Sequence, residues 1–201
     1  MKLENPNLDE VRLENPDIRY LRDIEKVIYD KEWLNDAPNE ELYYMYRGIK
    51  EDGDLRYDIT IIPAKMLGME FNKTKGHYHP ESYGELYIVL EGEAIYLLQK
   101  LDQEGEIEDV YMVEAQKGDC VAIPPGYGHI TINPAKEDLK MANWVYKTFE
   151  SIYKPIEEKG GGAYFYTNQG WIKNDNYKDL PDLRVEAPLK SMPQDLSFLK
   201  R

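Results

Sequence analysis

The stretch from residue 117 to residue 134 reads KGDCVAIPPGYGHITINP, and its glycines, prolines and single histidine follow a regular spacing. Five residues separate Gly118 from Pro124, one residue separates Pro124 from Gly126, and His129 and Asn133 complete the series. The segments KGD and PPGYG are typical of turns, and the apolar residues beside them are typical of strands. The stretch therefore predicts paired strands, with His129 at the start of the strand HITIN.

The chain between residues 41 and 171 alternates in the same way between strand-like and turn-like segments. Strand patterns recur about every 8–12 residues, which is typical of an all-β sandwich or barrel. The Asp-Gly pair in KEDGD suits a hairpin turn between the first two strands. The segments expected to form strands are 41–49, 54–65, 84–101 (divided near Glu91–Gly92), 108–134, 140–150 and 157–171.

The chain is long enough for one domain, in which three regions are expected. Residues 1–42 contain two similar segments, LENPNLDEVR and LENPDIRYLR, which predict an irregular arm, and then apolar residues at helical spacing, which predict a short amphipathic helix from Tyr20 to Leu34. Residues 43–178 form the β-domain. Residues 179–201 lack periodicity and are expected to wrap the domain or to meet a partner chain.

The three histidines of the chain fall where they could share a site. His77 and His79 are two residues apart, so on a strand both imidazoles point to the same side. Glu85 opens the next strand, with Glu81 as an alternative carboxylate. Together with His129, these residues form a ligand set for a first-row divalent metal such as Fe, Mn, Ni or Zn. The set contains too much nitrogen for calcium, and the lack of cysteine clusters argues against a closed structural zinc site.

The composition narrows the choice of partners and compartment. The formal net charge of -13 and the isoelectric point near 4.7 argue against binding to nucleic acid or anionic lipid. The single cysteine, Cys120, excludes an intrachain disulfide and, with the polar N-terminus, favours the cytoplasm. Seventeen tyrosines against four phenylalanines fit either a tyrosine-rich β-protein or a polar pocket lined by hydroxyls.

The spaced residues of 117–134 match the second sequence motif of the cupins, which are small jelly-roll β-barrels with a metal in the barrel mouth. The first cupin motif, HxH followed by Glu, six residues and Gly, is matched by His77, His79, Glu85 and Gly92. Two departures, a longer gap of five residues before Glu85 and Phe71 at a usual glycine position, point to a narrower match. TKGHYH with its long gap to ELY, IPPGYGH and EKGG together resemble the archaeal-type, cupin phosphoglucose isomerases over residues 43–161.

This resemblance implies a metal-dependent isomerase that interconverts glucose 6-phosphate and fructose 6-phosphate, a step of glycolysis and gluconeogenesis. It implies Fe(II) as the most expected metal, with Mn, Ni or Zn possible, and a homodimer that uses the arm and the tail. Lys75, Tyr153 and Lys159 are additional candidates at the pocket. The site residues implied are His77, His79, Glu85 and His129 as metal ligands, Glu85 and His129 as catalytic residues, and Tyr43, Thr60, Thr74, Gly76, Tyr87 and Tyr146 as substrate contacts.

Two other functions are compatible with the same ligand set. A cupin Fe(II) oxygenase would use the same four ligands, because a fold and a ligand set do not fix the reaction, but it would favour an apolar pocket. A non-enzymatic sugar-binding cupin would not need the intact set. For hydrogen transfer by the isomerase, the sequence leaves open both an enediol route, which needs a base, and a hydride route, which does not.

Overall fold

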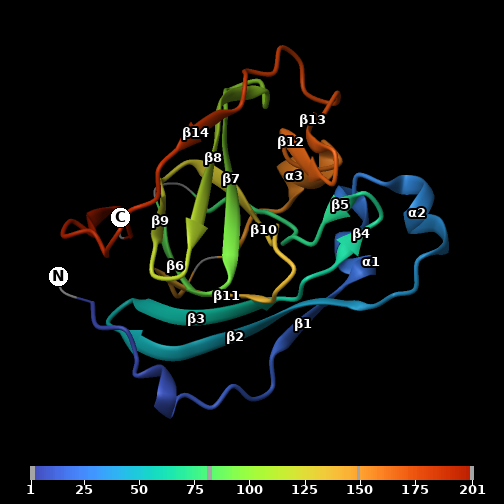
Figure 1. The fold of residues 1–201 in the computed structure, drawn as a ribbon. Helices are drawn as coiled ribbons and strands as arrows, with labels where there is room; N and C mark the ends of the chain where they lie inside the picture. Colours follow the sequence, from blue (N-terminus) through green and yellow to red (C-terminus); the bar gives the residue numbers. More distant parts are fainter. Residues whose placement is uncertain (1–2, 81–82, 149, 200–201) are drawn as a thin grey trace.

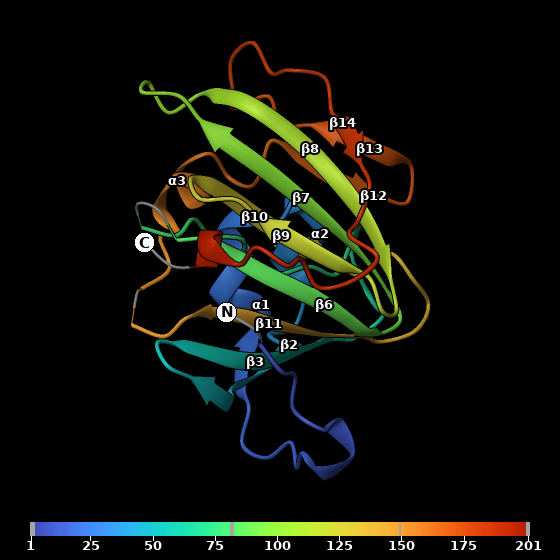
Figure 2. The same cartoon turned by 90° about the vertical axis from the view of Figure 1, so that its left-hand side faces the viewer.

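The computed structural model describes residues 3–80, 83–148 and 150–199, and two β-sheets face each other in it. Figures 1 and 2 show these sheets from two directions, with the smaller elements and both terminal segments on the outside. The six-stranded sheet has the order β1 (Asp17–Tyr20), β2 (Glu41–Asp52), β3 (Leu55–Ile62), β11 (Leu139–Tyr146), β6 (Glu85–Glu91) and β9 (Cys120–Ile123). The opposite sheet has the order β10 (Tyr127–Ile132), β7 (Glu93–Leu101), β8 (Ile107–Gln116) and β14 (Arg184–Glu186).

The two sheets form the predicted all-β cupin barrel because the chain passes from one to the other at short corners. Gly92 connects β6 of the first sheet to β7 of the second with a positive φ of 79°. A Cβ atom there would lie 2.8 Å from the carbonyl oxygen of Asp138. The glycine of the first motif is therefore required by the corner itself.

Short elements close one end of the barrel. A third sheet has the order β13 (Gly170–Lys173), β12 (Tyr164–Thr167), β5 (Glu70–Phe71) and β4 (Met66–Leu67). The helical segments are η1 (Leu8–Glu10), α1 (Leu21–Ile24), η2 (Glu25–Val27), α2 (Lys31–Asp36), α3 (Lys154–Glu158) and η3 (Ser197–Leu199). No helix in the described ranges is long and apolar enough to cross a membrane.

The strands β3, β11 and β6 of the six-stranded sheet are buried on both faces. On the outer face of this sheet, Tyr57 packs edge-to-face against Trp144, with ring centroids 5.1 Å apart. The same apolar cluster includes Leu3 near the start of the chain and Leu199 near its end. The inner face of this sheet therefore turns toward the opposite sheet, and its side chains surround the barrel interior.

The helix predicted over 20–34 is wrong as a continuous element, although its apolar residues are buried. The chain leaves helical geometry after η2, and α2 begins anew with Asp30 as its N-cap, whose Oδ1 accepts from Trp33 N at 3.0 Å. The Val27 carbonyl accepts from Lys73 Nζ at 2.8 Å, and Tyr29 N donates to Glu70 Oε2 at 3.0 Å. Backbone groups that a helix would pair internally are thus bonded to the barrel.

The C-terminal tail wraps the domain, which was one of the two expectations for it. Its strand β14 runs parallel to β8. Farther along, Leu189 and Cys120 exchange two backbone hydrogen bonds of 2.8 Å, and Gly84 N donates to Phe198 O at 2.8 Å. The tail therefore crosses the outside of β9 and ends beside the entry to β6.

Candidate metal centre and substrate pocket

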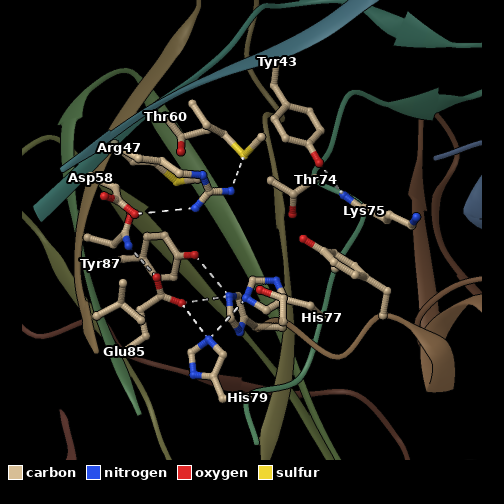
Figure 3. A pocket seen from close by; sticks show the side chains of 18 of the residues that line it. Tyr43, Arg47, Asp58, Thr60, Thr74, Lys75, His77, His79, Glu85 and Tyr87 are labelled. Carbon is tan, nitrogen blue, oxygen red and sulfur yellow. Dashed lines mark hydrogen bonds and ion pairs between the residues drawn. The ribbon is translucent and has the colours of Figure 1, made fainter. Parts of the chain in front are cut away.

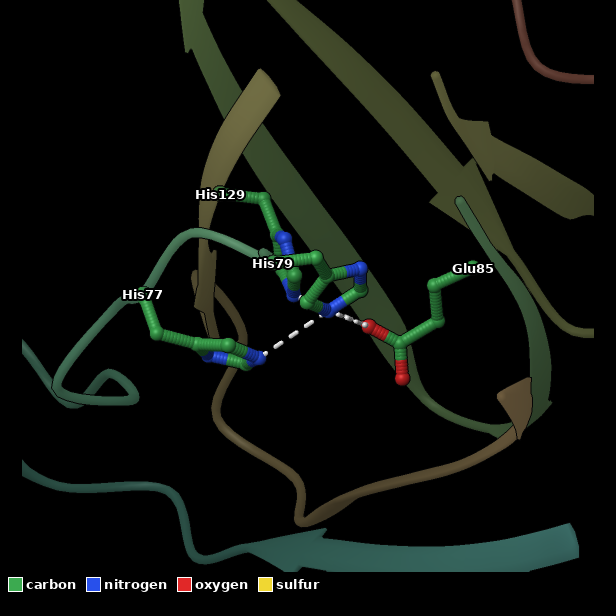
Figure 4. A group of neighbouring side chains, drawn as sticks. All are labelled: His77, His79, Glu85 and His129. Carbon is green, nitrogen blue, oxygen red and sulfur yellow. Dashed lines mark hydrogen bonds and ion pairs between the residues drawn. The ribbon is translucent and has the colours of Figure 1, made fainter. Parts of the chain in front are cut away.

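Backbone pairing sets the positions of two of the three histidines. His77 lies in an extended segment beside β10, and its N–H and C=O exchange hydrogen bonds of 3.2 and 3.0 Å with those of His129. His79, two residues further along this segment, presents its ring on the same side as His77. Glu85, the first residue of β6, faces them from the six-stranded sheet (Figure 4).

The ligand atoms of these four residues all lie within 4.8 Å of one another. Glu85 Oε2 is 3.2 Å from His79 Nε2 and 3.2 Å from His129 Nε2. His79 Nε2 is also 3.2 Å from His77 Nε2. Three imidazole nitrogens and one carboxylate oxygen that converge in this way match the ligand preferences of Fe, Mn, Ni or Zn. The residues present therefore fit a divalent metal.

The electrostatics of the cluster also suit a metal. Burial, and then the neighbouring imidazoles of His129 and His79, hold the pKa of His77 well below its usual value. Burial likewise lowers the pKa of His129, although Glu85 opposes this. Burial alone would raise the pKa of Glu85, but its hydrogen bonds to His129 and His79 outweigh burial and lower it. Neutral imidazoles and an ionised carboxylate are the protonation states that bind metal.

Glu85 shows how the surroundings orient a ligand. Its Oε1 accepts a hydrogen bond from Asn143 Nδ2 at 2.6 Å. Its Oε2 is buried and, within the described part of the chain, accepts no hydrogen bond beyond the contacts with the two histidine nitrogens. Asn143 thus fixes the carboxylate so that Oε2 is directed at the centre of the cluster. The alternative carboxylate, Glu81, lies outside the described residues.

A pocket opens above the four ligands, and the structure places most of the predicted substrate contacts in its wall (Figure 3). Lys75 and Tyr153 line it as well, whereas Lys159 lies elsewhere and binds Glu106 at 2.7 Å. The predicted substrate residues that line this pocket are Tyr43, Thr60, Thr74, Gly76 and Tyr87.

Tyr146 is the predicted substrate contact that does not line this pocket. Its ring stacks on Tyr83, with centroids 4.5 Å apart, and packs against the outer apolar cluster. Val145, its neighbour on β11, lines the pocket instead. Successive residues of a strand point to opposite faces, so a difference of one residue removes the tyrosine from the site.

Two hydroxyl groups in the wall are held so that they can donate into the pocket. Tyr43 Oη accepts a hydrogen bond from Lys75 N at 3.3 Å, and Thr74 Oγ1 accepts one from Thr131 N at 3.0 Å. Burial raises the pKa of Tyr43 to about 12, so its phenol stays protonated. A hydroxyl that already accepts a backbone bond still has its own hydrogen to donate.

Among the polar pocket residues that the sequence did not indicate are four on the strands of the six-stranded sheet: Arg47, Arg56, Asp58 and Asn143. They occupy alternate positions on β2, β3 and β11, and the residues between those on β3 and β11 are buried on the outer face. The alternation of polar and apolar residues can be recognised in the sequence, but it usually indicates a strand whose polar face is exposed to solvent. Here the polar face surrounds an internal pocket.

Comparison with known proteins places this chain in an enzyme family. The family model described as glucose-6-phosphate isomerase (GPI) matches residues 18–182. The chain is 34% identical over 175 residues to a glucose-6-phosphate isomerase of Thermococcus litoralis, covering 84% of this chain and 87% of the relative. It is 34% identical over 162 residues to one of Pyrococcus abyssi, covering 78% and 83%.

Among solved structures, an oxalate oxidase in complex with the substrate analogue glycolate is similar over 58% of this chain and 53% of that chain, with a TM-score of 0.42 and 17% identity. The assignment does not depend on this distant likeness. It depends on the family model, which spans most of the chain and both histidine segments, and on the relatives at 34% identity. These matches confirm the predicted resemblance, and the chain belongs to the glucose-6-phosphate isomerase family of enzymes.

Proposed function

We propose that this chain interconverts glucose 6-phosphate and fructose 6-phosphate in the pocket above the histidine cluster, with a divalent metal held by His77, His79, Glu85 and His129. The observation that carries the proposal is the convergence of these four ligands at the base of a pocket whose wall offers hydroxyl and backbone donors. The names of the archaeal relatives point to the same reaction.

The proposed metal is Fe(II), with Mn, Ni or Zn as alternatives that the same ligands accept. When bound, such an ion supplies a Lewis acid that polarises the sugar oxygens at C1 and C2. The chain itself holds the pKa values of His77, His129 and Glu85 low, which favours their metal-binding protonation states, and it fixes Glu85 through Asn143.

The wall of the pocket supplies donors for the phosphate. Thr74 and Tyr43 present hydroxyl hydrogens, and Gly76 has a positive φ of 79° beside them. A Cβ at Gly76 would overlap a side-chain carbon of Ile130, so only glycine fits at this place. Thr60 lines the same pocket from β3. Hydroxyl and backbone donors of this kind can hold a phosphate with few cations.

Glu85 and His129 are the proposed catalytic residues, and the route of hydrogen transfer decides what Glu85 does. On the enediol route, one oxygen of Glu85 would have to leave the cluster and accept the carbon-bound proton. On the hydride route, Glu85 stays a ligand. Turnover in deuterated water separates the two: deuterium at C1 or C2 of the product supports a base, and its absence supports direct hydride transfer.

Turnover of fructose 6-phosphate by Fe(II)-loaded protein tests the function. Formation of glucose 6-phosphate, followed with a coupled dehydrogenase, is the expected result. The substitution Glu85→Gln should abolish it, whereas the control Glu114→Gln changes an exposed glutamate on β8 and should not. Oxygen consumption without isomerisation would support the oxygenase alternative, and sugar binding without any turnover would support the non-enzymatic one.

Two further features belong to this proposal. We propose a homodimer in which the arm and the tail contribute to the contact, and a cytoplasmic location that fits the composition and the single buried cysteine. Light scattering tests the first, and a mass equal to one chain of 23.6 kDa would overturn it.

A further inference from the structure

Arg47 lies at the pocket for a reason that is visible in the backbone of β2. Tyr43, Met45 and Arg47 alternate along this strand and all line the pocket. The register between β2 and β3 shifts between Tyr46 and Lys50, so Arg47 lies within the irregular segment, and Gly48 next to it takes a positive φ of 66°. Such bulges re-aim the neighbouring side chain. Gly48 N donates to Asp58 Oδ1 at 2.8 Å, which fixes the bulge to the next strand.

The guanidinium of Arg47 is only partly paired. Its Nε donates to Asp17 Oδ2 at 2.9 Å on the outer side. In the described structure, Nη1 lies 3.7 Å from Asp58 Oδ2, beyond hydrogen-bond distance, and Nη2 faces the weakly accepting Sδ of Met45 at 3.4 Å. Asp58 is itself occupied by Gly48 N and by Arg56 Nε at 2.8 Å. The two terminal nitrogens of Arg47 thus lack a strong acceptor.

The other cations that line the described pocket are already engaged. Lys75 forms a close ion pair with Glu157, and its Nζ stands 4.9 Å from the ring centroid of Tyr153. Arg56 binds Asp58 and also donates to the Lys147 carbonyl at 3.3 Å. In the described pocket, Arg47 is therefore the lysine or arginine whose terminal nitrogens make no hydrogen bond to an oxygen. A protein of net charge -13 repels a phosphate dianion, so a positively charged donor in the pocket is needed to attract it.

We propose that Arg47 contacts the phosphoryl group of the substrate through Nη1 and Nη2, and so selects doubly charged phosphate esters. This inference rests on the proposed function. The planar fork of an arginine matches two phosphate oxygens at once, which a lysine cannot do. Asp17, from the arm strand β1, and Asp58, from β3, act as positioning residues that hold the guanidinium from opposite sides.

The test measures binding of sorbitol 6-phosphate, an unreactive analogue, to the metal-loaded protein by calorimetry. Arg47→Gln should weaken this binding about 10-fold or more, as expected for loss of hydrogen bonds to a charged group. Arg47→Lys, which keeps the charge and loses the fork, should fall between. The control Arg184→Gln removes the same charge from a β14 residue that pairs with Asp109 outside the pocket, and it should bind as the unaltered protein does.

A selectivity measurement separates contact with the ligand from a merely structural role. The unaltered protein should prefer sorbitol 6-phosphate to the singly charged sorbitol 6-sulfate, and Arg47→Gln should lose this preference with its metal content and melting temperature unchanged. Equal binding of the phosphate by Arg47→Gln and the unaltered protein, or a retained preference, would overturn the inference. If phosphate binding depends on Arg47 but no isomerisation occurs, the inference stands and the proposed function fails.

Discussion

Replacing Lys73 by Met removes a buried cation that connects the N-terminal segment to the barrel. The Lys73 ammonium donates to the Val27 carbonyl at 2.8 Å, pairs closely with Glu70, and stands 5.0 Å from the ring centroid of Phe165. The side chains of Lys73 and Glu70 are only 3% and 1% exposed. Methionine preserves most of the aliphatic packing, so the change isolates the charge.

The expected loss of stability follows from these contacts. Removing one partner of a buried ion pair costs about 3–5 kcal/mol, because the carboxylate of Glu70 is left uncompensated. The lost hydrogen bond to Val27 O adds about 1 kcal/mol. For a chain of this size, each kcal/mol shifts the melting temperature by about 2–4 °C. A total of about 4–6 kcal/mol therefore predicts a melting temperature roughly 8–24 °C lower.

Thermal unfolding followed by circular dichroism measures this shift. The double variant Glu70→Gln, Lys73→Met is the matched control, because a neutral amide can still accept from Tyr29 N and no charge remains buried. It should recover a large part of the lost stability. A Lys73→Met protein that melts at the temperature of the unaltered one, or a double variant less stable than Lys73→Met, would show that the buried charge of Lys73 does not stabilise the fold.

Three further predictions follow from the pocket and the buried pair. Asn143→Ala removes the 2.6 Å hydrogen bond to Glu85 and should weaken metal binding about 10–100-fold, measured by competition with a chelating dye; unchanged affinity would contradict the positioning role. Thr74→Val should raise KM for fructose 6-phosphate about 10-fold with kcat nearly unchanged, because it removes a hydroxyl donor that binds the phosphate equally well in the ground state and in the transition state. A lower kcat at constant KM would contradict this prediction. Burial raises the pKa of the Glu70 carboxyl even beside Lys73, so the folded state binds the carboxyl proton more tightly than the unfolded state does, and stability falls as pH rises above the ordinary pKa of glutamate. The loss of stability in Lys73→Met, measured by thermal unfolding, should therefore be larger at about pH 8 than at about pH 5. An equal loss at both pH values would count against this prediction.

The barrel and its ligand cluster could be predicted because both depend on local patterns. Strand and turn residues alternate at short intervals, and the HxH pair places two imidazoles on one side of any extended segment. The glycine after β6 is required by a corner that the motif spacing already implies. These features need no knowledge of which strands pair.

The rest depends on contacts between distant parts of the chain. The resemblance predicts Tyr146 in the pocket, but β11 presents Val145 there, because a difference of one residue along a strand moves a side chain to the opposite face. Arg47 and Asp58 have the alternation of a solvent-facing strand, and only the closure of the barrel turns that face inward. The helix over 20–34 breaks where Lys73 and Glu70 bind its backbone.

If the proposed function is right, the histidine cluster holds the metal on which isomerisation depends. The most direct measurement converts fructose 6-phosphate to glucose 6-phosphate with protein stripped by a chelator and then supplied separately with Fe(II), Mn(II), Ni(II) or Zn(II). We expect activity to disappear on stripping and to return with at least one of these metals. Folded protein that rebinds metal but shows no isomerisation with any of them, or full activity in the stripped protein, would contradict this expectation.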